Sequence, residues 1–543
     1  MFAPGNDLVT KVTESSEKPQ SLKSQSAWLL IAKIIGFGFS FVLPLMIVRY
    51  LTQEKVGLYR EAFQVITNAI IILPVGVSMS AYYYLARETE RRGQAILNIL
   101  LFNFVVGGFV CLSLFLYPQI IGNIFRSDEL TALVPKIGVV IWIWVFGAFL
   151  ENVAIANQEA RTATVFIILA QFSKTLLMGA AVFLFASVES FLYAAMVQGA
   201  LQTVILIVYL NSRFPGFWRG FEFRFFREQL GYAIPFGLTG ILWVLQTDIH
   251  NYFVGYKFSD SEYAIYAYGC FEVPLIAMLS DSVTSVLIPR MNTLQAASDC
   301  EEMIRLTARS MQKLAFFYFP IYVFLFVTAH TFITTLFGQN YAASASIFVI
   351  NITILPFAVM ITDPIVRSFK ELGRVFLAVR VAILILLVTV LYLGLGVFGL
   401  QGMITVAVGA VALEKCVAEF VITRKLGVGL RHLPLLKTIG KTAVISLAAG
   451  AVTYFVYEGL REYLLDLGSS IATQVFSTNK PSTLNFFGGG LVMAVSASVF
   501  ISIYLLGGGL WGVIEDDEKV WVKDALRRFL PKRGVATVPE TQG

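Results

Sequence analysis

Apolar residues come in runs of about twenty along this chain, separated by short polar segments. Runs of that length form helices that cross the roughly 30 Å hydrocarbon core of a bilayer. The first run lies between Ser26 and Arg49, and a short polar loop ending at Arg60 leads into the second run, residues 62–85. The pattern therefore predicts that the chain begins with a membrane hairpin.

The remaining runs predict an all-α, polytopic membrane protein with about 14 transmembrane helices. We expect two six-helix bundles around a central cavity, followed by two extra C-terminal helices. The expected divisions are an N-terminal tail (1–25), the first bundle (26–210), a linker (211–228), the second bundle (229–425), two additional spans (426–510) and a C-terminal amphipathic tail (511–543). The spans after the first hairpin are expected at 96–117, 135–156, 164–186, 190–210, 232–256, 262–288, 314–337, 343–366, 375–397, 402–422, 442–457 and 486–506.

Composition agrees with a membrane protein, because 57% of the residues are hydrophobic and only 14% are charged. Residues 1–25 are polar and lack the apolar core of a signal peptide. Most of the 41 lysines and arginines fall on one side when alternate loops are assigned to opposite sides. The positive-inside rule then places both termini in the cytoplasm. The net charge of +6 is attributed to this bias and to anionic lipid, not to nucleic acid.

Two segments outside the spans carry their own signals. Residues 211–228 interleave arginines with phenylalanines and Trp218, which is typical of an interfacial segment on an anionic surface. Asp299 is a predicted N-cap of an amphipathic helix, with Glu302 three residues later. The four cysteines are widely scattered, so we expect no disulfide and no metal site.

Ionisable residues inside the predicted spans are the candidate functional residues. Such residues normally face a bundle interior or a watery cavity, because lipid cannot compensate their charge. Lysines suit phosphate, whereas carboxylates and histidine can bind sugar hydroxyls or a coupling ion. The candidates for substrate binding are Lys33, Lys174, Asp248, His250 and Glu272, and those for ion coupling are Glu151, Asp281, Glu414 and Lys415. The alternative is structural pairing between helices, for example of Lys174 with Glu151.

Four segments carry a resemblance to a known family. They are RYLTQEKVGLYREAF (49–63), VGVSMSAYYYLARE (75–88), LGYAIPFG (230–237) and LFGQNYAASA (336–345). The chain resembles the polysaccharide-biosynthesis flippases of the multidrug/oligosaccharidyl-lipid/polysaccharide (MOP) exporter superfamily, the Wzx-type O-antigen and exopolysaccharide flippases. It departs from the lipid II flippase branch in lacking an arginine-rich first span.

The resemblance implies a multi-pass flippase of the bacterial cytoplasmic (inner) membrane that works by alternating access and is not an enzyme. It implies a polyprenyl-pyrophosphate-linked oligosaccharide moved from the cytoplasmic to the outer leaflet for surface polysaccharide synthesis, with Lys33, Arg60 and Lys174 holding the pyrophosphate. Proton or sodium coupling and polysaccharide polymerase partners fit this reading. No cofactor is expected, and the chain contains no GxxxxGK[ST] run for a nucleotide.

Two other functions remain open on the sequence alone. A cation-coupled multidrug exporter of the same superfamily would have the same architecture. An integral-membrane glycan polymerase or ligase would need a sizeable outer loop with catalytic side chains. The expected outer loop at 458–484 is a poor candidate, because its charged residues are mainly acidic.

Overall fold

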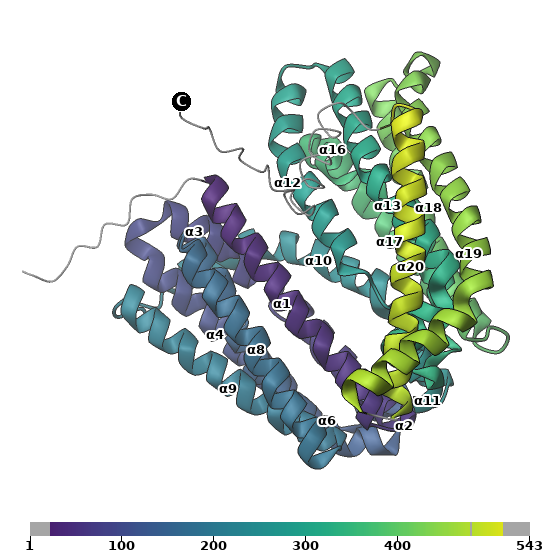
Figure 1. Cartoon of the computed structure of the whole chain (residues 1–543). Coiled ribbons are helices and arrows are strands. Elements are labelled where there is room, and N and C mark those ends of the chain that lie inside the picture. Colours follow the sequence, from purple (N-terminus) through teal and green to yellow (C-terminus); the bar gives the residue numbers. More distant parts are fainter. Residues whose placement is uncertain (1–21, 478–479, 514–543) are drawn as a thin grey trace, which may run out of the picture. The chain divides into compact units, whose positions relative to one another are not determined.

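A computed structural model of the chain describes residues 22–477 and 480–513 (Figure 1). Every regular element in these described ranges is a helix, so the predicted all-α class is confirmed. Most of the two predicted tails lies outside the described residues, although the first helix already begins at Leu22. The described chain forms two compact units, Met1–Val244 and Leu245–Gly543, which divide within one long helix.

Unit 1 is built from the helices of the predicted first bundle together with the beginning of α10. Polar residues begin several of these helices: the side chains of Thr52, Ser127 and Ser187 accept hydrogen bonds from backbone N–H groups in the first turns of α2, α6 and α9. The elements are α1 (Leu22–Tyr50), α2 (Gln53–Ile72), η1 (Val77–Ser80), α3 (Ala81–Arg87), η2 (Thr89–Arg91), α4 (Arg92–Leu116), α5 (Gln119–Phe125), α6 (Asp128–Gly147), α7 (Phe149–Ala156), α8 (Ala160–Phe185), α9 (Val188–Arg213) and α10 (Phe223–Lys257).

Unit 2 contains the rest of α10 and all later elements. Asp299 caps α13, as predicted, by accepting a hydrogen bond of 3.0 Å from the backbone N–H of Glu302. The elements are α11 (Asp260–Gly269), α12 (Pro274–Ala296), α13 (Cys300–Phe337), η3 (Gln339–Tyr341), α14 (Ser344–Ile352), α15 (Ile354–Ala358), α16 (Asp363–Ser368), α17 (Lys370–Gly394), α18 (Leu400–Leu426), η4 (Leu430–Leu436), α19 (Lys437–Phe476) and α20 (Pro481–Leu510).

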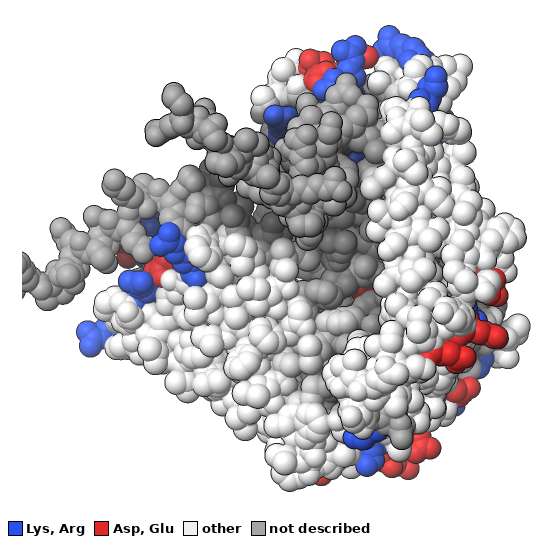
Figure 2. All heavy atoms as spheres, in the orientation of Figure 1, with Lys and Arg blue, Asp and Glu red and all other residues white. Residues whose placement is uncertain are grey.

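Nine helices within the described ranges are long and apolar enough to cross a membrane, or ten when the bent pair at 53–72 and 77–87 counts as one span. The nine are α4, α6 with α7, α8, α9, α10, α13, α17, α19 and α20. In Figure 2 the visible charged side chains gather in a few groups, and wide stretches of the surface between these groups are white. This distribution fits a multi-pass membrane protein, while the count of about 14 spans stays a prediction.

Three predicted spans are broken in the structure. The second bends by 41° between α2 and α3. The eighth, expected as one helix over 262–288, is interrupted by residues 271–273, which are not helical, and Pro274 begins a new helix instead of bending an existing one. The tenth consists of the short helices α14, α15 and α16. These breaks matter because non-helical backbone at membrane depth occurs only where protein or a cavity can satisfy it.

The expected outer loop at 458–484 is mostly helical. Helix α19 continues to Phe476 and α20 begins at Pro481. The two helices approach closely at a glycine pair, because a Cβ on Gly468 would lie 2.7 Å from the Cα of Gly488. Small residues at a helix crossing allow such close backbone approach. The hairpin is therefore a packed structural element, and the expectation that it is a loop was wrong.

Candidate functional site

Lys174 lies near the middle of α8, surrounded by an apolar sequence. Its ammonium nitrogen is 4.8 Å from the centroid of the Trp144 ring on α6, a cation–π contact. The indole N–H of Trp144 donates a hydrogen bond of 2.8 Å to the carbonyl of Ala195 on α9, which fixes the ring. Within the described residues Lys174 makes no ion pair, so the alternative pairing with Glu151 is not present.

Two neutral amides lie further along α9, the helix that accepts the Trp144 hydrogen bond. Gln198, which is buried, donates to the side-chain oxygen of Gln202 at 3.0 Å. Gln202 in turn donates to the carbonyl of Gly147 on α6 at 3.1 Å. Lys174 itself contacts the Trp144 ring and makes no carboxylate contact among the described residues.

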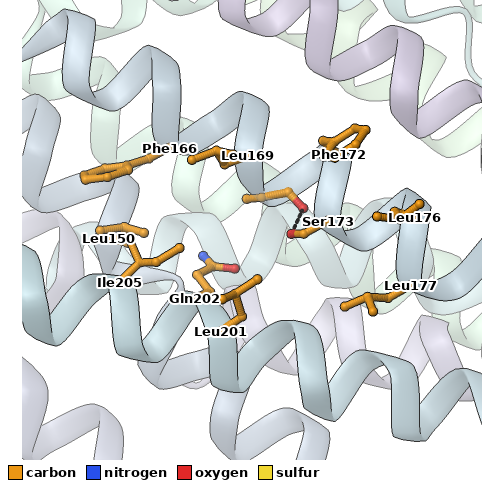
Figure 3. A pocket seen from close by; sticks show the side chains of 11 residues that line it. Leu150, Phe166, Leu169, Phe172, Ser173, Leu176, Leu177, Leu201, Gln202 and Ile205 are labelled. Carbon is orange, nitrogen blue, oxygen red and sulfur yellow. Dashed lines mark hydrogen bonds between the residues drawn. The ribbon is translucent and has the colours of Figure 1, made fainter.

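An apolar cavity of about 300 Å³ lies beside this region (Figure 3). Ser173 and Leu177, which flank Lys174 in the sequence, are among its lining residues. The hydroxyl of Ser173 is satisfied by the carbonyl of Ala170 at 3.1 Å, shown as the dashed line in Figure 3. The lining side chains come from α7, α8 and α9: Leu150, Phe166, Leu169, Ala170, Phe172, Ser173, Leu176, Leu177, Leu201, Gln202 and Ile205.

The other candidates in unit 1 differ in how deeply they are buried. Arg60 on α2 is half-buried, and Glu151 on α7 is exposed. Lys33 belongs to α1, but its side chain lies outside the described residues. The sequence interpretation missed Glu61, which is fully buried beside Arg60 on α2. Its signal was a carboxylate one residue before the second apolar run.

The break in the second span is held against α10. Val75 and Gly76 have positive φ angles of 44° and 76°. Positive φ strains a β-branched residue such as Val75, whereas glycine adopts it freely. A Cβ on Gly76 would lie 2.7 Å from the backbone nitrogen of Gly237. Two of the segments that carry the family resemblance, 75–88 and 230–237, therefore meet backbone to backbone.

A buried network of neutral side chains fixes the same region. Gln229 on α10 donates to the hydroxyl of Ser80 at 2.8 Å and accepts from the amide of Asn98 at 3.0 Å. Asn103 on α4 donates to the hydroxyl of Ser78 at 3.1 Å. All five residues are buried. The sequence interpretation did not single them out, because uncharged amides in apolar helices raise no strong signal by themselves.

Unit 2 holds an ion pair between two of its helices. Glu414 on α18 is buried, and one of its carboxylate oxygens accepts hydrogen bonds from Nη2 and Nε of Arg380 on α17, at 2.8 and 3.2 Å. Its other oxygen accepts a hydrogen bond from the side-chain amide of Gln246 on α10. The sequence interpretation missed both partners, although an arginine within the run 375–397 was a visible signal.

The remaining candidates in unit 2 do not join this pair in one cluster. His250 is buried and its Nδ1 lies 2.8 Å from the hydroxyl of Tyr266 on α11. Asp248 and Lys415 are half-buried, whereas Glu272 and Asp281 are exposed. Glu272 lies in the break between α11 and α12 and not inside a helix. Within the described ranges no group of three or more His, Cys, Asp or Glu could hold a metal ion.

Comparison with solved structures identifies the fold. The lipid II flippase MurJ in an inward closed conformation superposes with a TM-score of 0.64 at 14% identity, covering 90% of this chain and 98% of that chain. An inward-facing multidrug resistance MATE family transporter of the MOP superfamily gives 0.58 at 14% identity, covering 74% and 98%. A MOP superfamily transporter from Pyrococcus furiosus gives 0.54 at 16% identity, covering 75% and 96%.

Comparison of sequences gives the family. No curated protein matches the chain at a significant level. The profile of a family described as "Polysaccharide biosynthesis protein" matches residues 69–346, just over half of the chain, including the two segments that meet at Gly76 and Gly237. This multi-pass membrane protein, whose fold is that of the MOP superfamily transporters, belongs to the polysaccharide biosynthesis protein family.

Proposed function

We propose that the protein is a flippase that moves a polyprenyl-pyrophosphate-linked oligosaccharide across the cytoplasmic membrane by alternating access. The observation that carries the proposal is Lys174, a cation at mid-helix that contacts an aromatic ring and no carboxylate among the described residues. A lysine near the bilayer centre costs about 2.5–3.5 kcal/mol. An anionic ligand such as a pyrophosphate offsets that cost when it binds.

The family and the fold support the same cargo. The family is named for polysaccharide biosynthesis, and a similar solved structure is named a lipid II flippase. Outward movement of about two negative charges is favoured by roughly 4–5 kcal/mol per 100 mV when the cell interior is negative. The transport step therefore needs no nucleotide. The proposal also includes three expectations from the sequence: both termini are cytoplasmic, protons or sodium ions are coupled to transport, and a polysaccharide polymerase is a partner.

The proposed roles differ for the two classes of candidate. Lys174, with Arg60 and Lys33, binds the pyrophosphate, whereas Asp248, His250 and Glu272 bind the sugar. Coupling of protons or sodium is assigned to Glu151, Asp281 and Lys415. Glu414 is a weaker coupling candidate than the sequence suggested, because both of its oxygens already accept hydrogen bonds from Arg380 or Gln246.

The direct test measures flipping by the purified full-length chain in proteoliposomes, with a polyprenyl-pyrophosphate-linked disaccharide whose outward-facing fraction is detected with a lectin. We expect Lys174→Gln to lose flipping and Lys174→Arg to keep most of it. Lys136→Gln is the matched control, because Lys136 also lies against an aromatic ring, Tyr193, but is paired with Glu189 at 3.2 Å. Unchanged flipping by Lys174→Gln would reject the proposed site, and drug-cation transport by the wild type without lipid flipping would favour the multidrug exporter.

A further inference from the structure

The segment that joins α9 to α10 is fixed on the end of unit 1. Phe214, Phe217 and Phe225 are buried. Arg213 pairs with Glu159 at 3.0 Å, and Arg91 pairs with Glu222 at 3.1 Å. The segment therefore has a defined inner face packed on the helix bundle.

Its outer face is both aromatic and basic. Trp218, Phe221 and Phe223 are 53%, 46% and 68% exposed. Three exposed arginines alternate with them along the segment. We call this outer face the collar: Trp218, Arg219, Phe221, Phe223, Arg224 and Arg227. Within the described residues Arg219 and Arg227 make no ion pair, and Arg224 pairs with Glu228 at 3.5 Å while both side chains stay exposed.

The place of the collar in the fold indicates its surroundings. Helix α9 is long and apolar enough to cross a membrane, and the collar begins a few residues after its last residue, Arg213. The collar must then lie near the level where hydrocarbon gives way to lipid headgroups. Aromatic side chains are favoured at that level, where hydrocarbon and polar headgroups meet. Three exposed rings in bulk water would be unfavourable.

A buried donor lies at the start of α4, the helix that packs against the inner face of the segment. The Nε of Arg92, the first residue of α4, is buried and has no hydrogen-bond partner among the described residues. The following residue, Gly93, packs against the segment, because a Cβ there would lie 3.3 Å from the Cα of Phe217. Arg92 is therefore a further guanidinium group near the segment, with one donor that no described residue satisfies.

We propose that the collar binds the phosphate-bearing headgroups of anionic phospholipids. Guanidinium groups match phosphate oxygens in charge and geometry, and the rings anchor the segment in the interface. Arg219, Arg224 and Arg227 contact the phosphates, while Trp218, Phe221 and Phe223 insert between the lipids. This binding site is separate from the cargo site around Lys174 and does not depend on the proposed function.

The test follows the fluorescence of Trp218 in the full-length chain, obtained as the difference between the wild type and Trp218→Phe. The protein is placed in phosphatidylcholine vesicles that contain an equal mole fraction of brominated phosphatidylglycerol or brominated phosphatidylcholine. We expect the anionic quencher to be enriched at Trp218 by about fivefold or more, the ratio produced by one persistent arginine–phosphate contact.

Two triple variants separate a lipid site from general charge. The collar variant is Arg219→Gln/Arg224→Gln/Arg227→Gln. Its Trp218 signal is the difference between this variant and the same variant that also carries Trp218→Phe. We expect the enrichment of the anionic quencher at Trp218 to fall toward onefold. Lys55→Gln/Arg126→Gln/Lys136→Gln removes the same charge from the opposite helix ends of unit 1 and should retain the preference. Equal quenching by the two lipids would overturn the proposal and favour a soluble acidic partner. The proposal would also be overturned if Trp218 in the collar variant were still quenched more strongly by the anionic lipid, while the other tryptophans were quenched as in the wild type.

Discussion

Each unit has a cation within an apolar helix, but only the cation in unit 2 is paired with a carboxylate among the described residues. In unit 1 Lys174 lies over the Trp144 ring and makes no ion pair within the described residues. In unit 2 Arg380 is paired with the buried Glu414, whose second oxygen is bound by Gln246. A paired cation belongs to the internal structure, since its charge is already compensated. An uncompensated one retains the capacity to bind an anion, and this difference separates structural charges from candidate ligand sites.

The largest effect is expected from breaking the pair in unit 2. Arg380→Met leaves the carboxylate of Glu414 buried without its cation, which should reduce the free energy of unfolding by about 3–5 kcal/mol. Thermal unfolding in detergent, compared with the wild type, measures the loss. A variant as stable as the wild type would show that the pair does not hold the unit together.

A double variant sharpens this first prediction. Arg380→Met/Glu414→Met replaces both charges with apolar side chains of similar length. Because a buried ion pair contributes little beyond a well-packed apolar pair, we expect most of the lost stability to return, to within about 1–2 kcal/mol of the wild type. Additive losses from the two substitutions would indicate that each residue has an independent partner.

Lys174→Met should behave in the opposite way to Arg380→Met. Removing an uncompensated charge from an apolar helix should leave the unfolding temperature unchanged or raised. Flipping of the lipid-linked disaccharide should nevertheless fall by about 10- to 100-fold, since a charge-assisted hydrogen bond is worth about 1.5–3 kcal/mol. A strongly destabilised Lys174→Met would contradict the contrast between the two cations, because it would make Lys174 a structural residue.

The smallest effect on flipping is expected at the ring beneath Lys174. Trp144→Leu removes the cation–π contact and the indole donor to Ala195, and should cost about 1–2 kcal/mol of stability. Trp142→Leu is a suitable control, because that indole also donates to a backbone carbonyl but has no lysine over its ring among the described residues. We expect flipping to fall in Trp144→Leu and to persist in Trp142→Leu, measured in the same proteoliposomes. Equal flipping by both variants would show that the ring does not position Lys174.

The sequence was sufficient for the helical class and for most of the long apolar spans. Both follow from local properties. The length of an apolar run matches the thickness of the hydrocarbon core, and Asp299 marks a helix start through its own side chain. Positions of charges within spans were also visible. Lys174 and Glu414 are therefore predicted as candidates from the sequence.

The partners of those charges were not predictable in the same way. Hydropathy indicates that a residue lies in an apolar span but not which helix it faces. The pairing of Glu414 with Arg380 can therefore be seen only in the folded structure. The breaks in the spans were missed for a related reason. The bend after Ile72 depends on backbone packing between Gly76 and Gly237, residues far apart in the sequence.

The contact between Gly76 and Gly237 has an evolutionary consequence. Neither position can accept a side chain while the other backbone stays where it is, because an added Cβ on Gly76 would lie 2.7 Å from the nitrogen of Gly237. A related protein with a larger residue at one position must therefore also have a shifted backbone at the other position. The two positions should therefore be inherited as a matched pair among relatives, and recombination that splits them should yield chains that assemble poorly.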